Sequence, residues 1–216
     1  MDQEIFIGIR DYLTANTDTY LSAVKDHVSI SILSLAAAIG IGIPFGYAAV
    51  RYGRQEKLIM SIFQLLRIIP SLAVLFLLIP IMGTGVRPAM TALILLAVPP
   101  VLMNTATGLR QVPGFMLETA SAMGMTENEV WRKVRFPLAL PLILTGIKTA
   151  AIEIIASATL ASRIGAGGLG DIIFTGLGLY RVDLLVLGGA SAAILSISAA
   201  LLLDLSDRVL LKHNHL

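Results

Sequence analysis

The sequence predicts an all-α integral membrane protein, with five transmembrane helices and an N-terminal helix in the membrane interface. Of its 216 residues, 56% are hydrophobic and only 14% are charged, and the mean hydropathy is +0.84. An ordinary soluble domain carries about 25% charged residues. Apolar stretches recur along the chain, and about 20 apolar residues in a helix cross a bilayer core. The loops between these stretches are short, so they leave no room for a soluble domain.

Five apolar stretches are long enough to be spans. The second is interrupted only by Arg67, and the fourth contains Lys148 and Glu153, while the other three carry no charge. Proline and glycine recur inside the stretches, which favours a packed bundle around a pathway over a passive anchor. The alternative is that both residues are simply commoner in membrane helices. The predicted spans are 28–50, 58–82, 88–109, 136–162 and 184–203.

The first 26 residues differ from the rest of the chain because they are acidic. They lack the basic start and apolar run of a secretory signal. Their apolar residues fall on one helical face, which predicts an amphipathic helix lying in the interface. A loosely ordered polar tail is the alternative. We therefore separate residues 1–26 from a transmembrane domain over residues 27–216; the apolar face comprises Ile5, Phe6, Ile9, Tyr12 and Leu13.

The distribution of Lys and Arg predicts the orientation, because positive loops stay in the cytoplasm. An odd number of spans places the two termini on opposite sides, with the N-terminus outside and the C-terminus in the cytoplasm. The cytoplasmic side would hold nine basic residues, and the outer side would hold five: Arg10, Lys25, Arg87, Arg163 and Arg181. The nine are Arg51, Arg54, Lys57, Arg110, Arg132, Lys133, Arg135, Arg208 and Lys212.

Composition also excludes several classes of function. The net charge is only +2 and the basic residues form no stripe, so a nucleic-acid partner is not expected. The chain has no cysteine, and two of its three histidines, His213 and His215, lie in the last four residues. No set of nucleophile, histidine and acid is present. We expect neither an enzyme nor a metal or cofactor held by this chain.

The longest cytoplasmic segment, residues 110–137, has the pattern of two short helices joined by a glycine turn. Pro113 suits the first turn of a helix over residues 115–123, and Gly124 is a natural stop for it. Thr126 and Glu129 form a capping box that starts a second helix. We call this segment the knob; a chance helical hairpin is the alternative. Its apolar side chains need a partner to cover them: Phe115, Met116 and Met123.

Three charged residues lie inside predicted spans, where each costs on the order of 2.5–3.5 kcal/mol on insertion scales. Lys148 and Glu153 are five residues apart, about 140° around a helix, so they face each other poorly. A pair between Glu153 and Arg67 is more plausible. The three side chains either line a pathway or form structural pairs and snorkel to the interface.

A glycine-rich segment, Ile164–Gly170, follows the fourth span on the outer side. It is not a phosphate loop, because no Lys and Ser/Thr follow it and no strand precedes it. The glycines instead predict a tight outer turn before a helical patch over residues 171–179. The turn comprises Gly165, Gly167, Gly168 and Gly170.

The knob resembles the motif of permease subunits of binding-protein-dependent ABC importers: E-A-A, three residues, G, nine residues, I-x-L-P. Thr119, Val134 and Phe136 depart from the motif, whereas its other residues stand at the expected spacing. In the family this loop docks into a cleft of a cytoplasmic ATPase. The matching residues are Glu118, Thr119, Ala120, Gly124, Val134, Phe136 and Pro137.

Further segments resemble the osmoprotectant subfamily of the OpuC type, which imports glycine betaine, carnitine and choline. Residues 69–72 read I-P-S-L, residues 104–110 read N-T-A-T-G-L-R, and residues 164–170 read I-G-A-G-G-L-G. Arg67 is a departure, because an uncharged polar residue is commoner there. The resemblance covers roughly residues 44–180.

The resemblance implies a type I ABC importer permease fold of the MetI-like kind, in the cytoplasmic membrane of a bacterium. It also implies two ATPase subunits that carry ATP and Mg²⁺, a second permease subunit (identical or a paralogue) and an extracytoplasmic solute-binding protein. Alternating access would carry solute past the spans. A stand-alone channel or secondary transporter is the alternative, although such a transporter normally shows more spans and an internal repeat.

Overall fold

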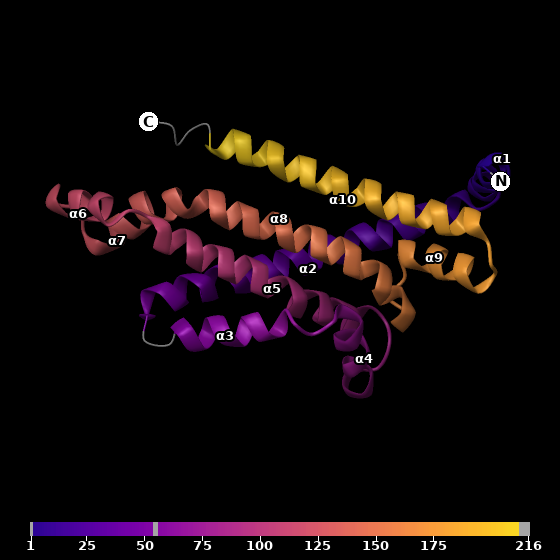
Figure 1. Cartoon of the computed structure of the whole chain (residues 1–216), viewed down its shortest axis with the longest axis horizontal. Coiled ribbons are helices and arrows are strands. Elements are labelled where there is room, and N and C mark those ends of the chain that lie inside the picture. The colour runs from indigo at the N-terminus through magenta and orange to yellow at the C-terminus, as the bar shows by residue number, and fades with distance from the viewer. Residues whose placement is uncertain (1, 54–55, 212–216) are drawn as a thin grey trace.

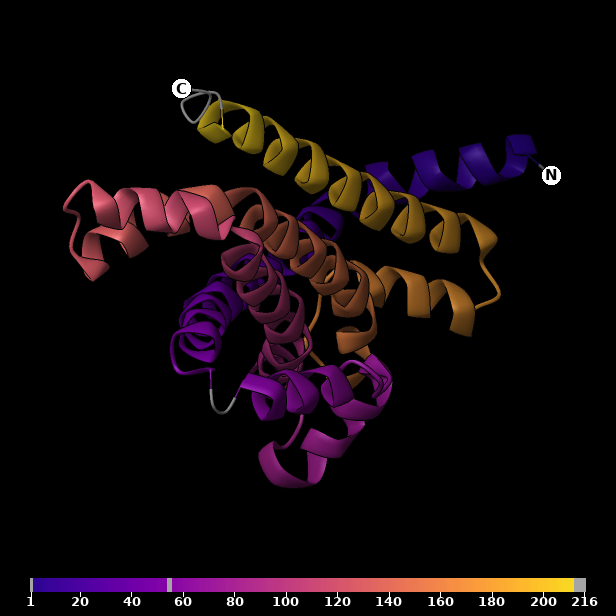
Figure 2. The same cartoon turned by 60° about the vertical axis from the view of Figure 1, so that its left-hand side comes forward.

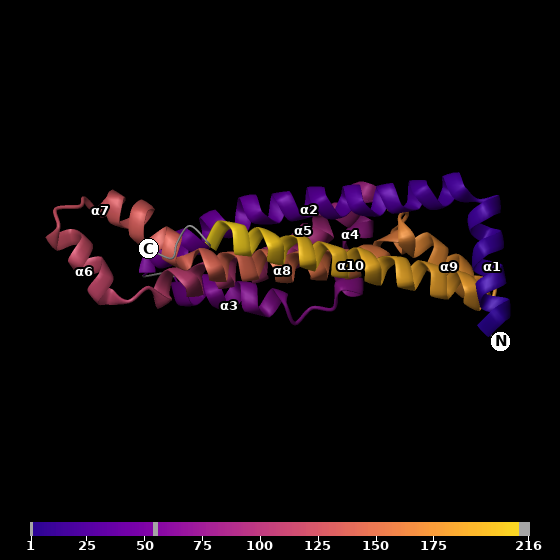
Figure 3. The ribbon, with the colours of Figure 1, turned by 90° about the horizontal axis from the view of Figure 1, so that it is seen from above.

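Long helices that lie side by side along one axis form the body of the molecule (Figures 1 and 3). The computed structural model describes residues 2–53 and 56–211, so Arg54, Lys212, His213 and His215 lie outside the described residues. The elements are α1 (Asp2–Ala15), α2 (Thr17–Arg51), α3 (Glu56–Leu66), α4 (Ser71–Met82), α5 (Val86–Gln111), α6 (Gly114–Ala122), α7 (Glu127–Glu129), the π-helix η2 (Val130–Arg135), α8 (Phe136–Ala161), the 3₁₀ helix η3 (Ser162–Ile164), α9 (Leu169–Gly178) and α10 (Val182–Leu211).

Four continuous helices contain the first, third, fourth and fifth predicted spans. They are α2, α5, α8 with its preceding turns, and α10, and each is long and apolar enough to cross a membrane. The all-α membrane fold is therefore confirmed. With 35 residues, α2 is about 52 Å long, well beyond a bilayer core of about 30 Å.

The second predicted span is not one helix, which corrects the prediction of a continuous span over 58–82. The chain bends by 93° between α3 and α4, so the two form either one broken span or a re-entrant loop. The break covers Arg67–Pro70, between the end of α3 at Leu66 and the start of α4 at Ser71. Pro70 has no backbone N–H and keeps the residue before it out of the helical region, so α3 cannot continue into α4. Counting the bent pair as one gives five spans within residues 2–53 and 56–211.

The N-terminal segment is divided between two helices. α1 ends at Ala15, and α2 begins at Thr17 and runs without interruption through residue 26. The apolar face of α1 packs in part on α9 and α10, because Ile9, Tyr12 and Leu13 contact the cluster that includes Leu169. Phe6 on the same helix remains exposed. The predicted amphipathic helix exists, and much of its apolar face is covered by protein.

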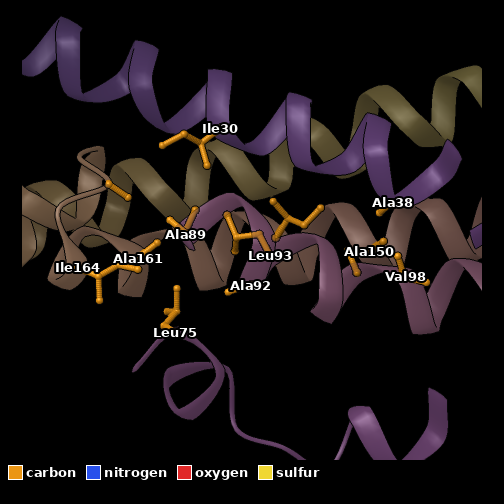
Figure 4. Packing of buried hydrophobic residues seen from close by; sticks show 14 of the residues in the cluster. Ile30, Ala38, Leu75, Ala89, Ala92, Leu93, Val98, Ala150, Ala161 and Ile164 are labelled. Carbon is orange, nitrogen blue, oxygen red and sulfur yellow. The ribbon is translucent and has the colours of Figure 1, made fainter. Parts of the chain in front are cut away.

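The core lies where α2, α5 and α8 meet, and small residues allow these helices to approach closely. Figure 4 shows Ile30 and Ala38 of α2 above Leu93 of α5, with Leu75 of α4 reaching the cluster from below. A methyl group on Gly46 would lie 2.7 Å from the carbonyl oxygen of Leu102. Gly42 and Gly46 are therefore packing residues, whereas Gly40 of the same span faces open space.

The two ends of the bundle differ. The knob and the end of α10 lie at one end, and α1 and α9 lie at the other (Figures 1 and 2). At the latter end, the Gly85 N–H donates to the Ile164 carbonyl oxygen at 2.6 Å, which ties the start of α5 to the glycine turn. The described termini therefore lie at opposite ends, as five crossings require.

Candidate functional site

The first half of the knob is the helix α6, which ends at a left-handed glycine. Gly124 has φ +87°. Its N–H donates to the Ser121 carbonyl oxygen at 3.0 Å, and the Met125 N–H donates to the Ala120 carbonyl oxygen at 3.2 Å. This pair of bonds is the Schellman pattern, which satisfies the last carbonyls of a helix. The predicted glycine stop is confirmed.

The second half begins at the predicted capping box. The Thr126 N–H donates to Glu129 Oε2 at 3.0 Å, and Lys133 Nζ donates to Glu129 Oε1 at 2.8 Å. The three residues of α7 then continue through η2 directly into α8. The prediction of a second separate short helix is therefore wrong. α7, η2 and α8 form one continuous rod, so the second half of the knob is an extension of a membrane helix.

Trp131, on the first turn of η2, packs the base of the knob against the bundle. We call this set of contacts the Trp131 clasp. Its ring is 9% exposed and meets the Tyr47 ring edge-on, with the centroids 4.9 Å apart. The Arg135 guanidinium lies 4.3 Å from the Trp131 centroid, and Arg135 Nε donates to the Leu109 carbonyl oxygen at 2.9 Å. Cation–π attraction and burial together favour this arrangement. The knob is thus joined to α2, α5 and α8 at once.

An ion pair adds a second link between the knob and α2. Arg51, the last residue of α2, pairs with Glu127 of α7. The sequence argument did not single out Arg51, Tyr47, Trp131 or Arg135 as parts of the site. The available signal was the sole tryptophan, standing among basic residues in a loop.

The residues of the predicted motif take different places on the knob. Glu118 and Thr119 are exposed on α6, where the Thr119 hydroxyl donates to the Phe115 carbonyl oxygen at 2.7 Å. Ala120 is buried beneath them. Val134, Phe136 and Pro137 lie on the rod where η2 passes into α8. The motif therefore spans both halves of the knob and its root.

The knob exposes apolar side chains, as predicted, beside the polar side chains of Glu118 and Thr119. Phe115 is 65% exposed and Met123 is 74% exposed, with Met116 beside them. A hollow of about 410 Å³ opens at the base between α2 and η2 and is lined by Tyr47, Asn128, Trp131, Arg132 and Phe136. A projection that exposes apolar side chains suits contact with another protein.

The three charged residues inside the spans form two ion pairs on different faces of α8. Arg67 and Glu153 lie 3.4 Å apart, which confirms the pairing expected from sequence. Lys148 Nζ lies 2.5 Å from Asp204 Oδ1 of α10, a partner that the sequence argument missed. The missed signal was that Asp204 directly follows the predicted fifth span.

The glycine turn at the other end has the geometry that only glycine accepts readily. Gly165, Gly167 and Gly168 all have positive φ values, between 76° and 94°. A methyl group on Gly170 would lie 2.0 Å from the Thr159 carbonyl oxygen, so α9 touches the end of α8 closely. The predicted turn is present, and it is followed by α9.

The long apolar helices, with a knob rooted in three of them, make up a membrane bundle that presents a surface to another protein. A scan against family models matches residues 38–214 to the family described as "Binding-protein-dependent transport system inner membrane component". The chain belongs to this family of permease subunits. It is therefore a multi-pass membrane protein and not an enzyme.

Two relatives agree with this assignment. The chain is 38% identical over 202 residues to the choline transport system permease protein OpuBB of Bacillus subtilis, covering 94% of this chain and 93% of that protein. It is 38% identical over 197 residues to the glycine betaine/carnitine/choline transport system permease protein OpuCB of the same organism, covering 91% of each.

Two solved structures share the fold. One is an inward-facing form of the MetNI methionine ABC transporter, with a TM-score of 0.78, 23% identity, and 90% of this chain and 97% of that chain covered. The other is an amino acid ABC transporter with histidines, with a TM-score of 0.77, 19% identity, and 91% and 96% covered. The expected MetI-like permease fold is confirmed.

Proposed function

We propose that this permease imports quaternary-ammonium osmoprotectants, namely glycine betaine, carnitine and choline. The named solutes of the two Bacillus relatives support this solute class, since identity of 38% extends over more than nine-tenths of each protein. The chain has only 13 aromatic residues, and its lone tryptophan is in the knob. A quaternary ammonium is usually bound by stacked aromatic faces. Tight binding therefore belongs to a separate extracytoplasmic solute-binding protein.

The knob is the docking site of a cytoplasmic ATPase, and the exposed apolar side chains of Phe115 and Met123 are the observation that carries this part of the proposal. Two ATPase subunits hold ATP and Mg²⁺, and their closure pushes on the knobs. The rod of α7, η2 and α8 transmits the movement into the bundle. The Trp131 clasp makes α2 and α5 move together with that rod. The excess of Lys and Arg near the knob supports a cytoplasmic knob and C-terminus and an outer N-terminus.

Five spans enclose too little space for a pore, so two permease subunits face each other across the pathway. The second subunit is another copy of this chain or a similar paralogue. Solute released by the binding protein enters an outward-open cavity between the two subunits and leaves after they tilt to the inward-open form. The intramembrane charges of one subunit then have either the pathway or the partner subunit beside them.

Uptake by the assembled importer tests the proposal. The permease, its ATPase and its binding protein are reconstituted in proteoliposomes, and entry of radiolabelled glycine betaine, carnitine and choline is measured with and without ATP. We expect ATP-dependent accumulation that stops when the binding protein is left out. Failure of the wild-type importer to take up any of the three solutes refutes the solute class. Passive flux through the permease alone supports the channel alternative instead.

A further inference from the structure

A hollow that contains charged side chains lies at the break between α3 and α4. Its volume is about 350 Å³, within the usual range for small-molecule pockets of roughly 300–1,000 Å³. The break supplies one wall and α8 supplies the opposite wall, with Leu96 of α5 between them. The lining is Arg67, Ile68, Ile69, Pro70, Ser71, Leu96, Glu153, Ala156 and Ser157.

The hollow holds one basic and one acidic side chain, Arg67 and Glu153. Arg67 and Glu153 lie 3.4 Å apart, which is longer than a charge-assisted hydrogen bond of about 2.7–2.9 Å. Their side chains are 44% and 36% exposed. Both charged groups therefore keep unused hydrogen-bonding capacity toward the hollow.

Lipid is an unfavourable neighbour for this pair. Charged side chains at membrane depth face a water-filled cavity or protein, because facing hydrocarbon costs several kcal/mol. Non-helical backbone such as that at Ile68–Pro70 follows the same rule, since its polar groups also need water or protein. In the proposed two-subunit importer, the region that offers both is the pathway between the subunits. The hollow therefore belongs on the pathway side of this chain.

We propose that the Arg67–Glu153 hollow is a weak contact site for solute in transit, and that it favours small zwitterions with a carboxylate and a quaternary ammonium. This inference rests on the proposed function. The solute carboxylate pairs with the Arg67 guanidinium, in the bidentate geometry that arginine offers. The quaternary ammonium lies against the Glu153 carboxylate. Glycine betaine satisfies both groups, whereas choline has no carboxylate and satisfies only Glu153.

The site is weak for two physical reasons. Its lining contains no aromatic side chain, so no cage surrounds the quaternary ammonium. The solute must also separate Arg67 from Glu153, which offsets part of the new attraction. A weak site suits transit, because a solute held tightly in the pathway leaves slowly.

Substitutions of the pair test the proposal in the reconstituted importer. With Arg67→Gln, we expect glycine betaine uptake to fall at least tenfold while choline uptake stays within about twofold. With Glu153→Gln, uptake of both solutes falls, and Arg67→Lys keeps part of the preference. The matched control is Lys148→Gln, which removes the cation of the other intramembrane pair and leaves the ratio of the two solutes unchanged. A ratio unaltered by Arg67→Gln overturns the inference, whereas a wild-type importer inactive on both solutes refutes the proposed function instead.

A chemical probe tests the same site without transport. The natural chain has no cysteine, so Ser157→Cys supplies a single thiol in the hollow. We expect a methanethiosulfonate reagent with a trimethylammonium group to react at least fivefold faster than a neutral one of similar size. Added Glu153→Gln removes that advantage, and glycine betaine slows the reaction. Ser198→Cys, beside the apolar groove between α2, α8 and α10, is the control and shows no such preference. Equal rates for both reagents at Ser157→Cys, whatever the transport result, contradict a cation-attracting site.

Discussion

Replacing Gly124 by valine is expected to uncouple the permease from its proposed ATPase. The residue has φ +87°, and a Cβ there meets no atom within 4 Å. Valine is therefore unfavourable because of the backbone conformation at this position and not because of a steric clash. A left-handed conformation costs about 1–2 kcal/mol for an ordinary residue, and a β-branched residue held in such a region costs up to about 3 kcal/mol.

This strain lowers the fraction of permease molecules whose knob has the conformation that binds the ATPase. Because about 1.4 kcal/mol is a tenfold change, 2–3 kcal/mol lowers that fraction by roughly 30- to 150-fold. The apparent dissociation constant for the ATPase rises by the same factor. The four long helices do not involve Gly124, so the variant still inserts into the membrane.

The assay measures binding of purified ATPase to the solubilised permease, together with ATP-driven uptake in proteoliposomes. The control is Gly114→Val, because Gly114 is equally open, with nothing within 4 Å of an added Cβ, and lacks a positive φ. We expect that control to change binding by no more than about twofold. Full affinity and transport in Gly124→Val would falsify the docking role of the knob.

Four other outcomes are expected. A single cysteine at Asn128 should be shielded from an impermeant thiol reagent in intact cells, whereas one at Thr17 should be labelled; the inverse pattern reverses the orientation. Trp131→Ala should destabilise the solubilised protein by about 3–5 kcal/mol, measured by thermal unfolding, because a large buried ring is lost; an unchanged midpoint contradicts the clasp. Burial and the nearby Asp26 raise the pKa of the Asp171 carboxyl above its ordinary value. The ionised form is thus disfavoured in the folded state, and this destabilisation disappears as the pH falls through that raised pKa. Asp171→Asn should therefore raise the thermal unfolding midpoint at pH 7 and not at pH 4. Equal gains at both pH values contradict the repulsion between Asp171 and Asp26. Calorimetry of the isolated permease should detect no micromolar binding of glycine betaine, carnitine or choline, and such binding would place tight recognition in this chain.

The local features of the fold follow from the sequence because they depend on residues near one another in the chain. The free energy of transferring an apolar segment into a bilayer is a sum over its residues, so hydropathy alone predicts the four continuous spans. The knob is readable in the same way, since Gly124 and the Thr126–Glu129 box act over a single helical turn. Arg67 and Pro70 are the sequence signals for the break between α3 and α4. A summed hydropathy does not detect that break, because it depends only on composition and not on the direction of the chain.

The tertiary structure decided which distant side chains meet. Lys148 pairs with Asp204 and Trp131 packs against Tyr47 because particular faces of α2, α8 and α10 are turned toward one another. Helical periodicity places a residue on a face, but it does not say which helix covers that face. The sequence alone therefore determined a membrane permease with a knob that turns at Gly124. Packing determined that the knob is rooted in three helices, and that Arg67 and Glu153 share a polar hollow at a broken span.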